Sequence, residues 1–266
     1  MTRMQRTTIS TCHPSFARRG TYSESHIGNG WVFGLRLLYR FENGINVYFT
    51  NKDEGDARSL VSKGIAEAEL TDKLGRQIRL VTAHQVHSEI VNIVDSRWAM
   101  APDADLPDGD ALVTRDDKLG LGILVADCAP VALVSDEGVF AAVHAGWQGV
   151  YKGILPQTVK VMRSLGATEI SAYVAPSIKS ECYEFRGEEL QQMSQILGPS
   201  VVGQTSWATV SLDLLESIKQ SLKTEAVTRI DASQDCTACG GDYFSYRARQ
   251  SPERHLMVIV GGGGRR

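Results

Sequence analysis

Four side chains that can bind a metal or act in catalysis stand at the ends of short apolar runs of the sequence. His84 and His87 follow one run, Cys128 follows a second, and His144 comes directly after a third. Binding and catalytic sites are commonly built where strands end. Two imidazoles and one thiolate suit Zn²⁺, and three protein ligands leave a fourth position for water or substrate. The pattern is therefore typical of a catalytic metal site.

The same residues allow two other interpretations. Cys128 could be a nucleophile that His144 activates as a base, with Asp127 orienting that base. Alternatively, Cys128 is a small buried core residue and the histidines are ordinary hydrogen-bonded groups. Spacing leaves all three interpretations open, because each of them depends on contacts in space.

The residues after His144 are unusual for the end of a buried strand. Ala145 and Gly146 are small, and Trp147 follows them. We expect the two small residues to keep space open around His144. Trp147 would then form one wall of a pocket.

An aromatic and basic segment near the end of the chain has two interpretations. The stretch DYFSYRAR, residues 242–249, reads either as an amphipathic strand or as the wall of a site. In the second case aromatic rings stack a base and Arg247 meets an anion. Tyr183 and Trp147 could contribute to the same wall.

The cysteines indicate a reducing compartment. An odd number of cysteines does not form a secreted disulfide framework, so we expect a cytoplasmic protein. Cys236 and Cys239 form a lone C-x-x-C, and a zinc ribbon needs a second pair, which the sequence lacks. We therefore expect them to be thiols at a turn beside Gly240 and Gly241, with no metal. The five cysteines are Cys12, Cys128, Cys182, Cys236 and Cys239.

Short runs rich in β-branched residues dominate the sequence, and helical patterns interrupt them irregularly. This arrangement favours an α+β fold with mixed sheets over a regular parallel array. The expected strands are 45–50, 78–82, 90–94, 111–114, 121–126, 131–135, 139–143, 170–174 and 256–260. The expected helices are 56–70, capped by Asp56, then 151–165, which Gly166 ends, 188–197, and 211–222, capped by Ser211.

Composition excludes several classes of function. The chain has 266 residues and a net charge of −3, so it has no basic surplus for binding nucleic acid. The longest apolar stretch, 119–134, contains Asp127 and Pro130 and does not predict a transmembrane helix. We expect a disordered tail over residues 1–25, one catalytic domain over residues 26–260, a frayed Gly/Arg tail over residues 261–266, and a monomer or weak homodimer.

Several motifs, taken together, resemble the YfiH-type family. This family is described variously as a multicopper polyphenol oxidase, as a purine nucleoside phosphorylase with adenosine deaminase activity, and as a peptidoglycan editing factor. The motifs occur in the family's order over roughly residues 45–260. They are QVHS (85–88), DGDALVT (108–114), ADCAPVAL (126–133), AAVHAGWQG (141–149), APSIKSECYEF (175–185), and CTAC with YFSYR (236–247).

The resemblance implies a metal triad of His87, Cys128 and His144 that binds zinc, with copper as the second possibility. It implies packed mixed sheets with outer helices, similar to the catalytic domain of a deamidating bacterial toxin. The implied reactions are phosphorolysis of adenosine, inosine, guanosine and methylthioadenosine, and deamination of adenosine by zinc-activated water. Arg247 or Lys179 would meet the phosphate.

Asp127 and Glu184 are the candidate general acid or base for these reactions. An alternative is an amidase that edits a peptidoglycan precursor, through Cys128 and His144 or through metal-activated water. Another is a copper-dependent polyphenol oxidase, and a non-enzymatic metal-binding protein is the last. Six histidines without a His-x-His pair do not fit the trinuclear centre of a multicopper oxidase.

The chain departs from the family's usual motifs in three places. Gln148 stands where an arginine is usual, Ser177 replaces a cysteine, and the segment between Asn51 and Gln85 is short. These departures bear on the contacts with phosphate and substrate. The metal triad is unchanged.

Overall fold

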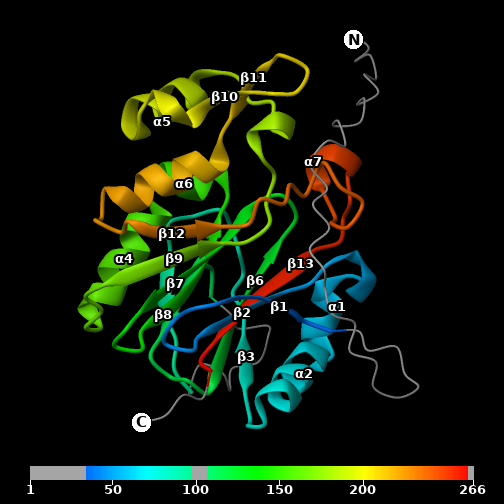
Figure 1. Cartoon of the computed structure of the whole chain (residues 1–266), viewed down its shortest axis with the longest axis vertical. Helices are drawn as coiled ribbons and strands as arrows, with labels where there is room; N and C mark the ends of the chain where they lie inside the picture. Colours follow the sequence, from blue (N-terminus) through cyan, green and yellow to red (C-terminus); the bar gives the residue numbers. More distant parts are fainter. Residues whose placement is uncertain (1–33, 97–106, 263–266) are drawn as a thin grey trace.

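Two β-sheets are stacked on each other, and helices cover the outer face of each sheet (Figure 1). The computed structural model describes residues 34–96 and 107–262. Both sheets combine parallel and antiparallel pairs, which confirms the expected α+β class. The five-stranded sheet has the order β1 (Arg36–Arg40), β2 (Asn46–Phe49), β13 (His255–Val260), β6 (Leu119–Val125), β3 (Arg79–Val81). The six-stranded sheet has the order β12 (Arg229–Ala232), β9 (Ile170–Val174), β7 (Ala129–Ser135), β8 (Phe140–Ala145), β5 (Ala111–Thr114), β4 (Val91–Ile93).

The helices form the two outer layers. One pair packs on the five-stranded sheet around the buried Leu70: α1 (Ala57–Ser62) and α2 (Ile65–Leu74). The other group packs on the six-stranded sheet: α3 (Trp147–Lys152), α4 (Ile154–Ser164), α5 (Glu188–Leu197) and α6 (Leu214–Lys223). A ribbon of β10 (Val202–Gln204) and β11 (Val210–Leu212) connects α5 to α6, and α7 (Tyr246–Arg249) precedes β13. Within the described ranges, no helix has the length and apolar composition needed to cross a membrane.

Alternation along the strands assigns each side chain to a layer, because successive side chains point to opposite faces of a sheet. In β8, Ala141 and Val143 belong to the cluster under the helices, whereas Phe140 and Ala142 belong to the cluster between the sheets. His144 has the parity of Ala142, so it points into the space between the sheets at the end of the strand. The layering thereby delivers an imidazole to one end of the inter-sheet core.

Every strand expected from the sequence coincides with an observed strand, and α5 has the expected bounds. The two longer helices are each divided where a glycine adopts a left-handed conformation, Gly64 at φ 68° and Gly153 at φ 93°. Asp56 caps α1 as expected, since its side chain accepts a hydrogen bond from the Arg58 backbone N–H at 3.2 Å. Gly166, with φ 95°, follows the end of α4.

Three expectations need correction. Ser211 does not cap a helix: it lies in β11, and Asp213 caps α6 by accepting a hydrogen bond from Glu216 N–H at 2.8 Å. Residues 242–249 do not form a strand; they form a turn followed by α7. Gly261, in the tail expected to be frayed, is buried, and its carbonyl accepts a hydrogen bond from Arg76.

Four strands were not expected from the sequence, namely β1, β10, β11 and β12. They are short and carry little apolar alternation, so their pairing partners decide their structure. The tail over residues 1–25 lies outside the described part of the chain, as do residues 263–266. The single domain over residues 26–260 stays a prediction.

His255, the first residue of β13, holds the segment that leads to α7. Its ring is fully buried and lies against the rings of Phe49 and Phe244, with centroids 5.5 and 5.0 Å away. Its Nε2 accepts a hydrogen bond from the Phe244 backbone N–H at 2.6 Å, which requires that nitrogen to be unprotonated. Burial lowers the pKa of His255 to about 4.

This pKa predicts acid sensitivity of the fold. Between about pH 6.5 and 4 the unfolded chain binds a proton at His255 while the folded chain keeps this residue neutral. The free energy of unfolding therefore decreases as the pH is lowered through this window, by up to about 3 kcal/mol. We expect His255→Gln, which cannot titrate, to flatten the dependence in this window, measured by urea unfolding at each pH. His84→Gln, at an exposed histidine, should keep the wild-type slope; equal slopes in all three proteins would contradict the assignment.

Candidate metal and substrate site

Three residues far apart in the sequence converge at one end of the inter-sheet core. One donor atom from each of His87, Cys128 and His144 lies within 4.8 Å of the others. Cys128 Sγ is 3.9 Å from His87 Nε2, and the two imidazole rings meet edge to face with centroids 4.7 Å apart. His144 is buried, Cys128 is partly buried and His87 is exposed, so the cluster faces solvent on one side. The structure thus brings together the residues of the expected triad.

A buried carboxylate, Asp110, organises two of the three ligands. It accepts hydrogen bonds from the backbone N–H groups of Val86, His87 and Ser88 at 3.2, 3.0 and 2.6 Å, and from the Ser88 hydroxyl at 2.8 Å. These bonds hold His87 in a left-handed backbone conformation, with φ 57°, that residues other than glycine seldom adopt. The loop after β3 is therefore shaped around one carboxylate.

Asp110 also fixes the orientation of His144. Its Oδ1 lies 2.7 Å from His144 Nδ1, so Nδ1 carries the proton and Nε2 is left for a ligand. This carboxylate–histidine arrangement is the one that supports metal-binding histidines in proteins. Burial alone would raise the pKa of Asp110, but the hydrogen bonds from His144 and Ser88 hold it well below its usual range.

Cys128 and His144 stabilise each other's charged forms. Burial opposes ionisation of both groups, but the neighbouring imidazoles lower the pKa of the Cys128 thiol, and the thiolate together with Asp110 raises the pKa of His144. A thiolate is the form in which cysteine binds a metal or attacks an electrophile. The electrostatics therefore support either role of Cys128.

Gly146 makes room for the cluster, as expected from its position after His144. A Cβ at this position would lie 3.0 Å from Cys128 Sγ and 3.2 Å from His87 Cδ2. Its φ of −74° is open to any residue, so the requirement for glycine is one of space alone. Trp147 then begins α3 beside the opening.

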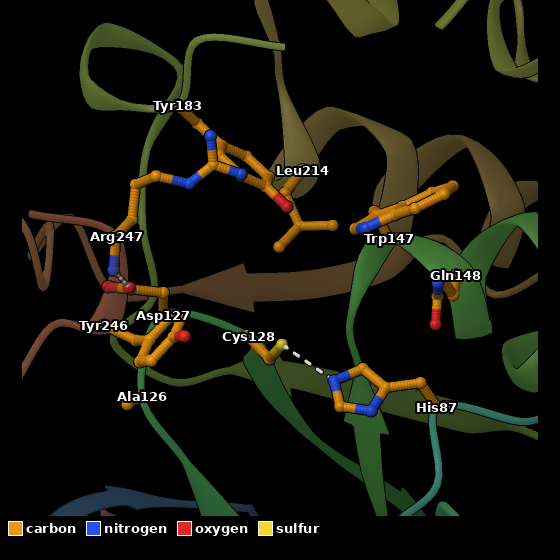
Figure 2. A pocket seen from close by; sticks show the side chains of 10 residues that line it. All are labelled: His87, Ala126, Asp127, Cys128, Trp147, Gln148, Tyr183, Leu214, Tyr246 and Arg247. Carbon is orange, nitrogen blue, oxygen red and sulfur yellow. Dashed lines mark hydrogen bonds between the residues drawn. The ribbon is translucent and has the colours of Figure 1, made fainter. Parts of the chain in front are cut away.

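A cavity of about 260 Å³ opens above the cluster. Figure 2 shows Tyr183 and Arg247 on one side of it, Trp147 and Gln148 on the other, and Cys128 and His87 at the bottom. The Arg247 guanidinium stacks over the Tyr183 ring at 4.8 Å from its centroid and donates to the Glu184 carbonyl at 3.0 Å. Of the stretch 242–249, which was expected to form an aromatic and cationic wall, Tyr246 and Arg247 line the cavity, and both lie on α7. Phe244 packs on His255 instead.

Asp127 connects the pocket wall to the cluster. Its backbone is left-handed, with φ 81°, and its carboxylate accepts hydrogen bonds from the Thr237 hydroxyl and the Arg247 backbone N–H, each at 2.7 Å. Both oxygens are engaged, so these contacts give Asp127 a positioning role, and its expected role as a catalytic acid or base stays a prediction. Glu184 does not line the cavity; its carboxylate accepts from Trp207 Nε1 at 2.9 Å.

Lys179 lies outside the pocket, which does not favour its expected contact with phosphate. Its Nζ is 3.5 Å from the Ser177 hydroxyl, and its backbone N–H donates to Cys236 Sγ at 3.4 Å. Burial lowers the pKa of Lys179. Lys179 lies beside Cys236, which pairs with Ser177 as an isolated bridge.

Sequence reasoning assigned no role to Asp110. The signal that could have found it is an acidic residue at the head of the fully buried run 111–114, because a carboxylate carried into a core needs several donors. Leu214, which lines the cavity, carried no such signal.

Replacement of Asp110 tests its role as organiser. In Asp110→Asn, an N–H₂ group replaces one carboxylate oxygen and cannot accept hydrogen bonds from the donors that face it. We therefore expect the free energy of unfolding to decrease by on the order of 2–4 kcal/mol. We also expect the zinc affinity, measured by competition with a chelator, to weaken by about 10–100-fold, as is typical when a residue that supports a metal ligand is lost. Asp108→Asn is the matched control, because Asp108 holds the exposed His84 at 2.7 Å. Equal effects of both changes would contradict the role of Asp110.

Gly146→Ala tests whether the cluster needs open space. A methyl group at this position overpacks the site, which costs about 1–3 kcal/mol and corresponds to roughly ten- to a hundredfold weaker zinc binding. Gly241→Ala should leave affinity unchanged, because no atom lies within 4 Å of the added Cβ. Wild-type affinity in Gly146→Ala would show that the cluster relaxes freely.

Comparisons with known proteins identify relatives of this chain by sequence. The purine nucleoside phosphorylase ORF3 of Streptomyces griseus is 35% identical over 191 residues, 69% of this chain and 76% of that protein. The purine nucleoside phosphorylase of Aquifex aeolicus is 31% identical over 196 residues, 73% of this chain and 91% of that protein. Both relatives are named as purine nucleoside phosphorylases, one from Streptomyces griseus and one from Aquifex aeolicus.

Solved structures share the fold. The YfiH protein of Bacillus licheniformis superposes with a TM-score of 0.71 at 22% identity, over 82% of this chain and 92% of that one. YlmD of Geobacillus stearothermophilus gives 0.69 at 26% identity, over 82% and 92%. The family pattern described as multi-copper polyphenol oxidoreductase laccase matches residues 43–261. The chain belongs to this YfiH-type family.

Proposed function

We propose that the protein is a metal-dependent purine nucleoside phosphorylase that also deaminates adenosine. The observation that carries the proposal is the convergence of His87, Cys128 and His144 at the bottom of a cavity bounded by aromatic and cationic side chains. The names of the relatives support the phosphorylase activity, and the donor set supports the metal. The nucleosides we propose are adenosine, inosine, guanosine and methylthioadenosine.

The three ligands fit zinc because two imidazoles and one thiolate are its preferred donors. Asp110 holds Nδ1 of His144 in the protonated form, which leaves Nε2 for the ion. Zinc bound there would supply Lewis-acid activation of water or of a substrate oxygen. Cu²⁺ binds such donors more tightly than Zn²⁺, so copper could fill the same site in solutions that contain it.

The walls of the cavity would bind the two substrates. Trp147 and Tyr183 contribute aromatic rings to the lining of the cavity, and aromatic rings suit a purine base. Arg247 offers a fixed guanidinium for phosphate, since stacking on Tyr183 holds it in place. Phosphorolysis then forms a bond from a phosphate oxygen to the ribose C1′ and breaks the bond from C1′ to the purine nitrogen.

Two alternatives remain as proposals of lower rank. The mutual charge stabilisation of Cys128 and His144 also fits an amidase with a cysteine nucleophile. A copper-dependent polyphenol oxidase of the multicopper type would need several copper sites with histidine ligands. Among the described residues, one cluster of potential metal ligands contains histidine, so this alternative gains no support. A cytoplasmic location and a monomer or weak homodimer also stay predictions.

Product analysis tests the proposal. Zinc-loaded protein is incubated with adenosine, with and without phosphate, and adenine, inosine and hypoxanthine are separated by chromatography. We expect adenine only with phosphate, and inosine independently of phosphate. His87→Ala and Cys128→Ala should each lower both rates by at least about 100-fold, more than the loss of a supporting residue costs. His84→Ala, three positions from His87 and outside the cluster, should keep them.

The outcomes separate the alternatives. Undiminished rates in His87→Ala and Cys128→Ala would overturn the site assignment. An absence of all three products in the wild type would overturn the nucleoside chemistry. Covalent labelling of Cys128 by an electrophilic amide in metal-free protein would then support the amidase.

A further inference from the structure

A second cluster of potential metal ligands lies away from the triad. The sulfur atoms of Cys182, Cys236 and Cys239 all lie within 4.8 Å of one another. Cys182 ends a short 3₁₀ helix (Ser180–Cys182), and the other two stand in the turn that follows β12. The expectation that the C-x-x-C motif lacks metal partners considered only a second pair. The structure instead supplies a third thiol from a segment more than fifty residues earlier in the chain.

The geometry of the thiols fits one tetrahedral ion. Zinc–sulfur bonds of about 2.3 Å place two sulfurs on the same ion at roughly 3.8 Å from each other. Cys182 and Cys239 are 3.1 Å apart, so a small separation of the side chains would admit the ion. Cys182 and Cys236 are buried and Cys239 is exposed, which gives an ion a path of entry.

The surroundings favour thiolates at this position. The Lys179 backbone N–H donates to Cys236 Sγ at 3.4 Å, a contact that favours the thiolate over the thiol. The side chain of Lys179 also interacts electrostatically with Cys236. Bound Zn²⁺ would offset two of the negative charges of the three thiolates.

A fourth donor stands beside the thiols. Glu181 Oε1 lies 3.6 Å from Cys239 Sγ, a separation that suits two ligands of one ion. The donor atoms that all lie within 4.8 Å of one another are the three sulfurs, so the Glu181 side chain would have to turn toward Cys182 and Cys236 to complete the site. Glu181 directly precedes Cys182, so the short helix delivers both donors.

We propose that Cys182, Cys236 and Cys239, with Glu181 as the fourth ligand, form a structural Zn²⁺ site. This site is separate from the metal triad at the bottom of the cavity. Four protein ligands close the coordination sphere, which is typical of structural zinc and leaves no position for substrate.

The site would fasten together the two segments that carry the pocket wall. Ser177 already pairs with Cys236, and the Thr237 N–H donates to the Ser177 carbonyl at 3.2 Å. Tyr183 follows Cys182 directly, and Thr237 binds the carboxylate of Asp127, which in turn holds the Arg247 N–H. Bound zinc therefore stabilises the positions of Tyr183 and Arg247.

Metal counting on the full-length chain, purified under reducing conditions and loaded with zinc, tests this proposal. We expect two zinc ions per chain in the wild type, one in Cys128→Ser, one in Cys236→Ser, and none in the double variant, by elemental analysis after gel filtration. Cys236→Ser should also lower the melting temperature. One zinc in the wild type together with none in Cys128→Ser would overturn the proposal.

Cobalt substitution gives a second test that leaves the three cysteines intact. In Cys128→Ser, whose remaining thiols are those of the second cluster in the described residues, bound Co²⁺ should show intense thiolate charge-transfer absorption and tetrahedral d–d bands. Glu181→Gln on this background should shift the d–d bands, because a ligand changes. Absence of the charge-transfer bands would contradict a metal site. A disulfide between Cys182 and Cys239 would also contradict it; such a bond lowers the intact mass by two hydrogens under non-reducing conditions, and proteolysis would map it to these two residues.

Discussion

The burial of one charged carboxylate, that of Asp110, is the constraint on which the rest of the site depends. A carboxylate without water is stable only if donors surround it, and here they come from the backbone of residues 86–88, the Ser88 hydroxyl and the imidazole of His144. Those donors belong to two of the segments that carry the proposed metal ligands. Satisfying the carboxylate therefore also fixes the positions of His87 and His144.

A second carboxylate, that of Asp127, does the same for the wall of the pocket. It lies next to Cys128 in the sequence, and it binds Thr237 and the backbone of Arg247. The two ends of the pocket are thus each built on an acidic residue that holds other chain segments. Each carboxylate is associated with a residue other than glycine whose backbone is left-handed: His87 beside Asp110, and Asp127 itself. The hydrogen bonds of the two carboxylates hold the backbone in these conformations.

The packing of the two sheets explains why the site lies where it does. β6 belongs to the five-stranded sheet and β7 to the six-stranded sheet, so residues 126–128 cross from one sheet to the other. The crossing ends with Cys128 at the margin of the inter-sheet core, where the alternation of β8 also places His144. The helices at the outer face of the six-stranded sheet then supply Trp147 and Leu214 to the cavity.

The sequence by itself determined the local features and the family. Apolar runs located the central strands, because strands that are buried on both faces require almost continuous apolar residues. The histidines and the cysteine of the triad were visible because these residue types are few in the chain. Family motifs then selected His87 over His84, which spacing could not do.

Only the tertiary structure decided which distant groups meet. It gave Asp110 its partners, moved Lys179 out of the pocket, and placed Cys182 beside Cys236 and Cys239. It also divided two helices at glycines and made a short helix of residues 246–249. In each case the deciding interaction joins segments distant in the chain, or depends on a backbone conformation that packing selects, and neither leaves a local pattern of residues.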